Sequence, residues 1–175
     1  TDFHWDELHW LLKYFIVSRT DQWYLSLFDV DVGSLKGEAT PAYSILVKES
    51  VEHIFHLMPD IKIIFILRNP IERIWSACRM VLGDVKKTLT KEQEERIHQH
   101  LHNPWNIRRT QYLETLKIWS TFYPSDRIHL GFFDDLVHRP SQFFLEVYDF
   151  LEVPSPDRIY GKELINSRNA SPDYA

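Results

Sequence analysis

The sequence has 175 residues, the length of one domain and enough to bury a core. Its hydrophobic content of 44% and charged content of 26% are typical of a folded soluble protein. The net charge of −5 argues against a general nucleic-acid binder, which normally has a basic excess, so we expect no nucleic-acid partner. A small anionic ligand remains compatible, because it needs only a local cluster of hydrogen-bond donors.

The N-terminal part is predicted to contain two helices joined by a turn-rich connector. Residues 6–17 carry apolar side chains at helical spacing, with Asp6 as the N-cap. In residues 29–43, two glycines and a proline are expected to break any regular element. Apolar side chains recur with helical period again over residues 44–58, and Pro59 ends that second helix.

The middle of the chain predicts a strand followed closely by a helix. Residues 61–67 are short, β-branched and almost continuously apolar, which suits a strand that is covered on both faces. Asn69 and Pro70 form a good N-cap and first position for a helix that runs to about Met80.

The remaining elements predict an α/β fold. An exposed polar helix is expected over residues 91–101, an amphipathic helix over 107–122, a second buried strand over 127–133 and a helix over 141–151. Strands that alternate with helices indicate a parallel sheet. Two strands are too few for a free-standing sheet, so we expect further strands outside this chain or within its irregular parts.

Cysteine and hydropathy patterns bear on the compartment. Cys78 is the only cysteine, so no disulfide can form within the chain, which fits a reducing compartment and predicts a cytoplasmic protein. The longest apolar run, Ile63 to Leu67, is far too short to span a bilayer. The first residues, TDFHWDE, lack the basic region and apolar core of a signal peptide.

Arg68 and Ser76 form a candidate anion site. Ligands of open α/β sheets bind beyond the carboxyl ends of the strands, where Arg68 follows the first predicted strand. The next helix is expected to point free amide groups toward the same space. Ser76 follows Asn69 by about two helical turns and so returns to the same side. One phosphate could thus bind both the guanidinium of Arg68 and the hydroxyl of Ser76.

A purely structural interpretation competes with this one. Arg68 could pair with Glu72, and Ser76 could be an ordinary helix residue. For an isolated arginine after a strand, that interpretation would be preferable. The Asn-Pro pair together with a second arginine, Arg73, favours the anion site.

The segment ILRNPIERIWS, residues 66–76, resembles the 3′-phosphate-binding motif of sulfotransferases that use 3′-phosphoadenosine 5′-phosphosulfate (PAPS). In that family the first arginine and the serine of R-[ND]-P-x-x-R-x-x-S hold the 3′-phosphate, which implies these roles for Arg68 and Ser76. The stretch GEATPAY (37–43) and residues 112–153 are similar to family segments in the same order. The resemblance covers most of the chain and is closest to the glycan-type and bacterial branch.

The resemblance implies a P-loop NTPase-like three-layer sandwich with a central parallel sheet, formed by a single sulfotransferase-like domain over residues 1–175. It implies transfer of a sulfuryl group from PAPS to a hydroxyl or amine of a small-molecule or glycan acceptor, without a metal. It also adds an alternative location, the Golgi lumen, for the soluble part of an anchored enzyme.

The opening DFHWD is similar to the family's [KE]-x-H-F-F-D segment, which contains the catalytic base. The resemblance implies Asp2 as that base, with His4 as the alternative. Such a group would take the proton of the acceptor hydroxyl as its oxygen attacks sulfur. The competing interpretation is that both are frayed terminal residues.

The chain also departs from the family pattern. The Gly-rich 5′-phosphosulfate loop is not found, since none of the five glycines stands in a G-x-x-x-x-G-K-[ST] array. Ala39 stands where some glycan sulfotransferases have a lysine, and the final NSRNASPDYA is similar to the start of a later cofactor loop. We therefore expect a domain truncated at both ends, and the alternative function is a non-catalytic binding domain that has lost the donor loop.

Three other residues allow more than one interpretation. Glu38 could reach the active site or, as the preferred interpretation, hold its loop by bonding backbone amides. His98 and His102 are one helical turn apart, a spacing that can bind zinc. Their helix is strongly polar, so a solvated face is the preferred interpretation there.

Overall fold

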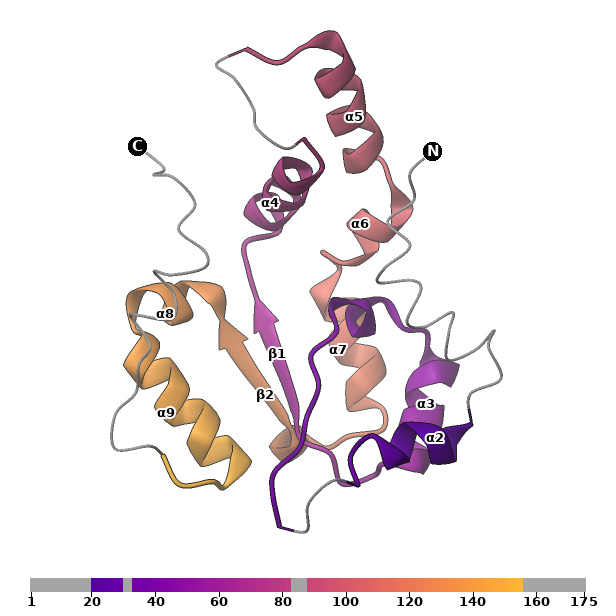
Figure 1. Ribbon diagram of the computed structural model, residues 1–175, viewed down its shortest axis with the longest axis vertical. Helices are drawn as coiled ribbons and strands as arrows, with labels where there is room; N and C mark the ends of the chain where they lie inside the picture. Colours follow the sequence, from indigo (N-terminus) through magenta and orange to yellow (C-terminus); the bar gives the residue numbers. More distant parts are fainter. Residues whose placement is uncertain (1–19, 30–32, 83–87, 156–175) are drawn as a thin grey trace.

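The computed structural model describes residues 20–29, 33–82 and 88–155, which form a small parallel sheet flanked by helices (Figure 1). The predicted helix over residues 6–17 lies outside this part of the chain. Strand β1 (Ile63–Leu67) pairs in parallel with β2 (Ile128–Phe132), in a register that runs from Ile63 opposite Ile128 to Leu67 opposite Phe132. The α/β character and the parallel pairing predicted from the sequence are thus confirmed.

The helices before β1 are α2 (Asp21–Ser26), the 3₁₀ helix η1 (Pro41–Ile45) and α3 (Lys48–Leu57). Those between the strands are α4 (Pro70–Leu82), α5 (Lys91–Leu101), α6 (Pro104–Arg108), α7 (Tyr112–Ser120) and the 3₁₀ helix η2 (Ser125–Arg127). After β2 come α8 (Phe133–His138) and α9 (Pro140–Leu151). The sequence patterns did not predict α2 or α8.

Two predicted helix boundaries are wrong. The single helix expected over 107–122 is two helices, because Thr110 donates both its N–H (2.9 Å) and its hydroxyl (2.6 Å) to the Ile107 carbonyl and so ends α6 in a tight turn. The helix expected over 44–58 begins at Lys48. Pro41 does not break regular structure but starts η1, where its fixed φ fits and its missing N–H costs nothing.

One face of the sheet packs against α3 and α7. The buried side chains of Leu46, Val51, Trp119 and Tyr123 form the core, and Ile63 and Ile128 pack on it from the amino ends of the strands. The Tyr123 hydroxyl donates to the Met58 carbonyl at 3.0 Å, which ties the end of α7 to the end of α3.

The other face packs against α9. Phe143 of α9 lies so close to Gly131 that a Cβ there would be 2.6 Å from the ring, and His129 packs on Phe150 at 5.2 Å. Because α9 packs mainly on β2, Ile64 and Ile66 of β1 stay 38% and 43% exposed. The prediction that the first strand is covered on both faces is therefore wrong for these two residues.

Candidate functional site

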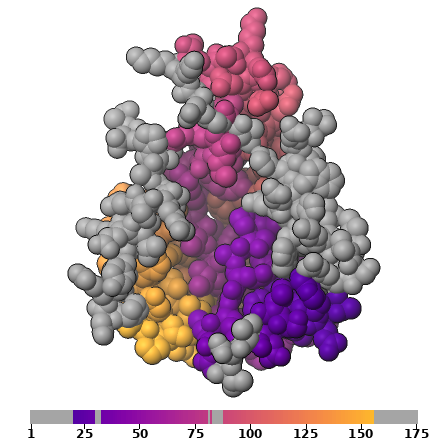
Figure 2. All heavy atoms as spheres, in the orientation of Figure 1, coloured from indigo at the N-terminus to yellow at the C-terminus, as the bar shows by residue number. Residues whose placement is uncertain are grey.

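A cavity of about 1190 Å³ opens beside β1. It is lined by α2, the 35–44 segment, α3, β1 and the start of α7. The space-filling view shows the surface hollowed between the indigo N-terminal segments and the magenta residues of the middle of the chain (Figure 2). Most of the lining is apolar, and two polar groups of residues stand out: arginines at the carboxyl end of β1, and a carboxylate held by two tyrosines.

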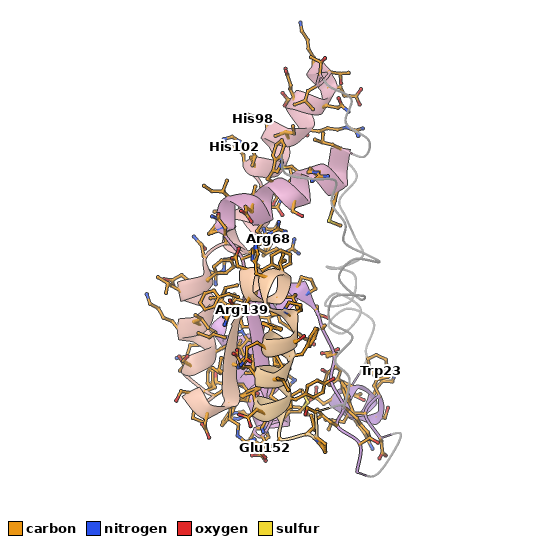
Figure 3. The ribbon with its side chains drawn as sticks, turned by 90° about the vertical axis from the view of Figure 1, so that its left-hand side faces the viewer. Trp23, Arg68, His98, His102, Arg139 and Glu152 are labelled. Atoms are coloured by element: carbon orange, nitrogen blue, oxygen red, sulfur yellow. The ribbon has the colours of Figure 1, made fainter. Side chains whose placement is uncertain are left out.

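Arg68 follows directly after β1 and lies at the end of the sheet toward α4 (Figure 3). Its guanidinium carbon is 4.5 Å from the centre of the Phe133 ring, which begins α8 after the neighbouring strand. Its Nε is 3.5 Å from Oε2 of Glu72, and this Nε is buried without a hydrogen bond. The Arg68–Glu72 pair of the structural interpretation is thus present, but it is long and half-exposed, so it stabilises the fold little.

The start of α4 is capped as the sequence predicts. Asn69 Oδ1 accepts the Ile71 N–H at 3.0 Å, and Pro70 at the first helical position has no N–H. The helix therefore offers fewer free amides than expected, and an anion at this position depends mainly on side chains. Ser76 lies two turns further along α4 and is half-buried.

Tyr112 connects the start of α7 to the end of β1. Its ring meets Phe65 edge to face at 5.9 Å. Burial raises the pKa of the Tyr112 hydroxyl, while the charge of Arg73 and a hydrogen bond with the Arg68 backbone partly offset that rise. The hydroxyl therefore lies close to both arginines.

Arg73 and Arg109 line the cavity together with Arg68 and Tyr112. These three arginines come from the end of β1, from α4 and from the C-cap of α6 before α7. Arg109 and Tyr112 are site residues that the sequence motifs did not predict. The available clue was the tyrosine-led helix in the family resemblance, with Arg109 three residues before that tyrosine.

Glu38 accepts hydrogen bonds from two tyrosine hydroxyls, Tyr24 at 2.6 Å and Tyr43. Burial and this bond to Glu38 raise the pKa of Tyr43 far above its usual value. Glu38 therefore holds its loop as expected, but through side chains and not through backbone amides. Both donors bind the same carboxylate oxygen, Oε1, which fits a role in holding the loop.

Asp2 and His4 lie outside the described residues. The rings of His98 and His102 stack at 4.1 Å on exposed positions of α5 and its C-cap. Within residues 20–29, 33–82 and 88–155, no three histidine, cysteine or acidic side chains gather as a metal site would require. In the same part of the chain, no helix has the length and apolar character needed to cross a membrane.

Comparisons with known proteins show the family and the fold of this chain. The sequence model of the sulfotransferase family matches residues 7–157. The fold is also similar to the crystal structure of a sulfotransferase from Alicyclobacillus acidocaldarius, with a TM-score of 0.62 and 24% sequence identity. That match covers 88% of this chain and 69% of the other, and at this identity it shows a shared fold alone. Because the family match spans most of the sequence, this chain belongs to the sulfotransferase family.

Proposed function

We propose that the protein transfers a sulfuryl group from PAPS to a hydroxyl or amine of a small-molecule or glycan acceptor. The observation that carries this proposal is the position of Arg68 at the carboxyl end of β1, in a family motif that continues to Ser76 on α4. The P-loop NTPase-like three-layer sandwich belongs to the same proposal, and helices on both faces of the described sheet support it.

Each described residue has a defined task in this proposal. Arg68 binds the 3′-phosphate of PAPS with its guanidinium, and Ser76 donates its hydroxyl to the same group. The Phe133 ring packs against the Arg68 guanidinium and restricts its movement, so less side-chain entropy is lost when the anion binds. Glu72 is the partner that Arg68 exchanges for the phosphate.

The chemical step requires a base. We assign that role to Asp2, with His4 as the alternative, so the acceptor proton moves to a carboxylate or imidazole as the acceptor attacks sulfur. When bound, PAPS would supply the sulfuryl group, and the bond between sulfur and its 5′-phosphate oxygen would break, so that 3′-phosphoadenosine 5′-phosphate leaves with the charge on its 5′-phosphate. Positive side chains near that phosphate would stabilise its growing charge.

The test compares two ligands that differ by one phosphate. Thermal unfolding is followed while the protein is titrated with 3′-phosphoadenosine 5′-phosphate and, separately, with adenosine 5′-phosphate. We expect stronger stabilisation by the first ligand, because a ligand that binds only the folded state raises its stability. Arg68→Ala and Ser76→Ala should remove this preference, with a loss of about 10- to 100-fold in affinity for Arg68→Ala.

Arg96→Ala is the matched control, because Arg96 is also ion-paired four residues from a glutamate but lies on α5. It should leave both titrations unchanged. Equal stabilisation by the two ligands in the unsubstituted protein would refute the assignment of Arg68 and Ser76. A second assay incubates the protein with PAPS and a panel of hydroxyl and amine acceptors and measures the release of 3′-phosphoadenosine 5′-phosphate. If the protein prefers the ligand with the 3′-phosphate but releases no product, a non-catalytic binding domain is favoured instead.

A further inference from the structure

We propose that Arg109 is a further anion-binding residue of this site and, with Arg68, recognises a phosphate monoester as a dianion. The inference rests on the proposed function, because the 3′-phosphate of PAPS is the monoester concerned. It adds a specificity-determining residue that lies outside the R-N-P-x-x-R-x-x-S segment and on a different part of the fold.

The position of Arg109 carries the proposal. Arg109 forms the C-cap of α6, three residues before Tyr112, and it lines the same cavity as Arg68 and Arg73. The Tyr112 ring packs on Phe65 of β1, which fixes the start of α7 beside the end of this strand. In Figure 1 the α6–α7 turn and the start of α4 both lie toward the carboxyl end of β1.

Charge points to an anion as the ligand. The chain carries a net charge of −5, yet three arginines, Arg68, Arg73 and Arg109, line this cavity. A doubly negative ligand would be attracted by the charges of these arginines, and each guanidinium can exchange a resting contact for it.

The turn that carries Arg109 is firmly held. Thr110 ends α6 with two hydrogen bonds to the Ile107 carbonyl, and the Gln111 N–H donates to the Arg108 carbonyl at 3.1 Å. Below the turn, the buried Thr115 hydroxyl donates to the Ser44 carbonyl at 2.6 Å. A fixed backbone lowers the entropy lost on binding, so Arg109 is preorganised for a ligand.

The chemistry of the arginines defines the ligand class. A guanidinium offers a planar fork of N–H donors that matches two oxygens of a phosphate, and it stays charged at all relevant pH values. Several forks around one site favour a terminal phosphate with three free oxygens over a diester. The 3′-phosphate of the proposed donor has this form.

The experiment uses Arg109→Gln, with Arg108→Gln as the matched control. Arg108 is the residue before Arg109 at the end of α6, and it does not line the cavity. Its substitution by glutamine removes the same charge. Affinities for 3′-phosphoadenosine 5′-phosphate and adenosine 5′-phosphate are measured by calorimetry on each variant. We expect Arg109→Gln to weaken the first ligand about tenfold or more and to leave the second unchanged. Arg108→Gln should keep the ratio of the two affinities.

The ratio separates ligand binding from a structural role. An equal loss for both ligands in Arg109→Gln, or no loss, would overturn the inference. Arg109→Lys decides the matter if Arg109→Gln does not fold: it keeps the charge but loses the fork, so the ratio should fall by a smaller factor. An unchanged ratio in Arg109→Lys would then overturn the inference.

Failure of the proposed function would look different. In that case the unsubstituted protein would show no preference for the ligand with the 3′-phosphate, and both proposals would fall. A preference that is lost in Arg68→Ala but kept in Arg109→Gln and Arg109→Lys would leave the function intact and remove only the role of Arg109.

Discussion

The two ends of the sheet differ in how tightly their side chains are packed and buried. At the amino end, Ile63 and Ile128 pack on a core in which Val51 and Tyr123 are 0% and 1% exposed. At the carboxyl end, Phe132, the last residue of β2, is 51% exposed. Arg68 packs there on the Phe133 ring, and its Nε lies 3.5 Å from Oε2 of Glu72. The amino end therefore stabilises the fold, while the carboxyl end keeps polar groups available.

This difference has a physical reason. A buried apolar core gains free energy from every contact and leaves no group able to bind a ligand. An arginine that is to bind an anion must exchange its partner at little cost, so its resting contacts have to be weak. Substitutions at the two ends should therefore separate stability from ligand binding.

The largest effect on stability is expected from Trp119→Ala. Trp119 is 8% exposed and stacks on Tyr123 at 5.8 Å, so its removal leaves a cavity in the core. We expect a loss of about 3–5 kcal/mol in the free energy of unfolding, measured by chemical denaturation.

Trp105→Ala is the matched control, since Trp105 is 47% exposed on α6. Its effect should stay within about 0.5 kcal/mol, as for most surface substitutions. A similar loss in both variants would mean that burial does not distinguish the two tryptophans, and the contrast between the ends of the sheet would not hold.

A smaller effect is expected from Gly131→Ala, one residue before the end of β2. A methyl group there would lie 2.6 Å from Cε2 of Phe143, a side chain that is only 3% exposed. We expect a loss of about 1–3 kcal/mol in the free energy of unfolding. This change tests how far the tight packing extends toward the carboxyl end.

Two further variants make this test specific. Gly37→Ala is the control, because nothing lies within 4 Å of a Cβ at that position. The double variant Gly131→Ala with Phe143→Leu should recover part of the stability, since the two residues are in contact and their effects are not additive. A loss in Gly131→Ala that the second substitution leaves unchanged would mean that the contact with the Phe143 ring is not its cause.

The sequence predicted the elements with strong local patterns. The apolar run of β1, the Asn-Pro start of α4 and the position of Arg68 after the strand are set by neighbouring residues, so they could be read in order along the chain. The break between α6 and α7 could not be predicted in this way. It depends on the Thr110 hydroxyl, which donates to the Ile107 carbonyl within an otherwise helical pattern.

The candidate site was predictable only in part, for a related reason. Arg68 and Ser76 lie in one motif, whereas Arg109 and Tyr112 reach the same place through the packing of α7 on β1. Glu38 was expected to bond nearby amides, but its partner Tyr24 lies on α2, fourteen residues away along the chain. Long-range contacts of this kind leave no local pattern in the sequence.

The smallest effect, and the one that bears most directly on the carboxyl end, is expected from Glu72→Gln. Glu72 is the half-exposed partner of Arg68, and its negative charge competes with an incoming phosphate. Exposed pairs contribute about 0.2–1 kcal/mol, so we expect affinity for 3′-phosphoadenosine 5′-phosphate to rise up to about fivefold. The gain should shrink at high salt, which screens exposed charges.

Glu92→Gln provides the control for this last variant, because Glu92 forms the same four-residue pair with Arg96, at 3.2 Å, on α5. Calorimetry at low and high salt should show no change in affinity for this control. Weaker binding in Glu72→Gln would give Glu72 a different role, in which its carboxylate orients the Arg68 guanidinium for the ligand. The sign of the change therefore decides whether the resting pair at the carboxyl end of the sheet competes with the anion or prepares the site for it.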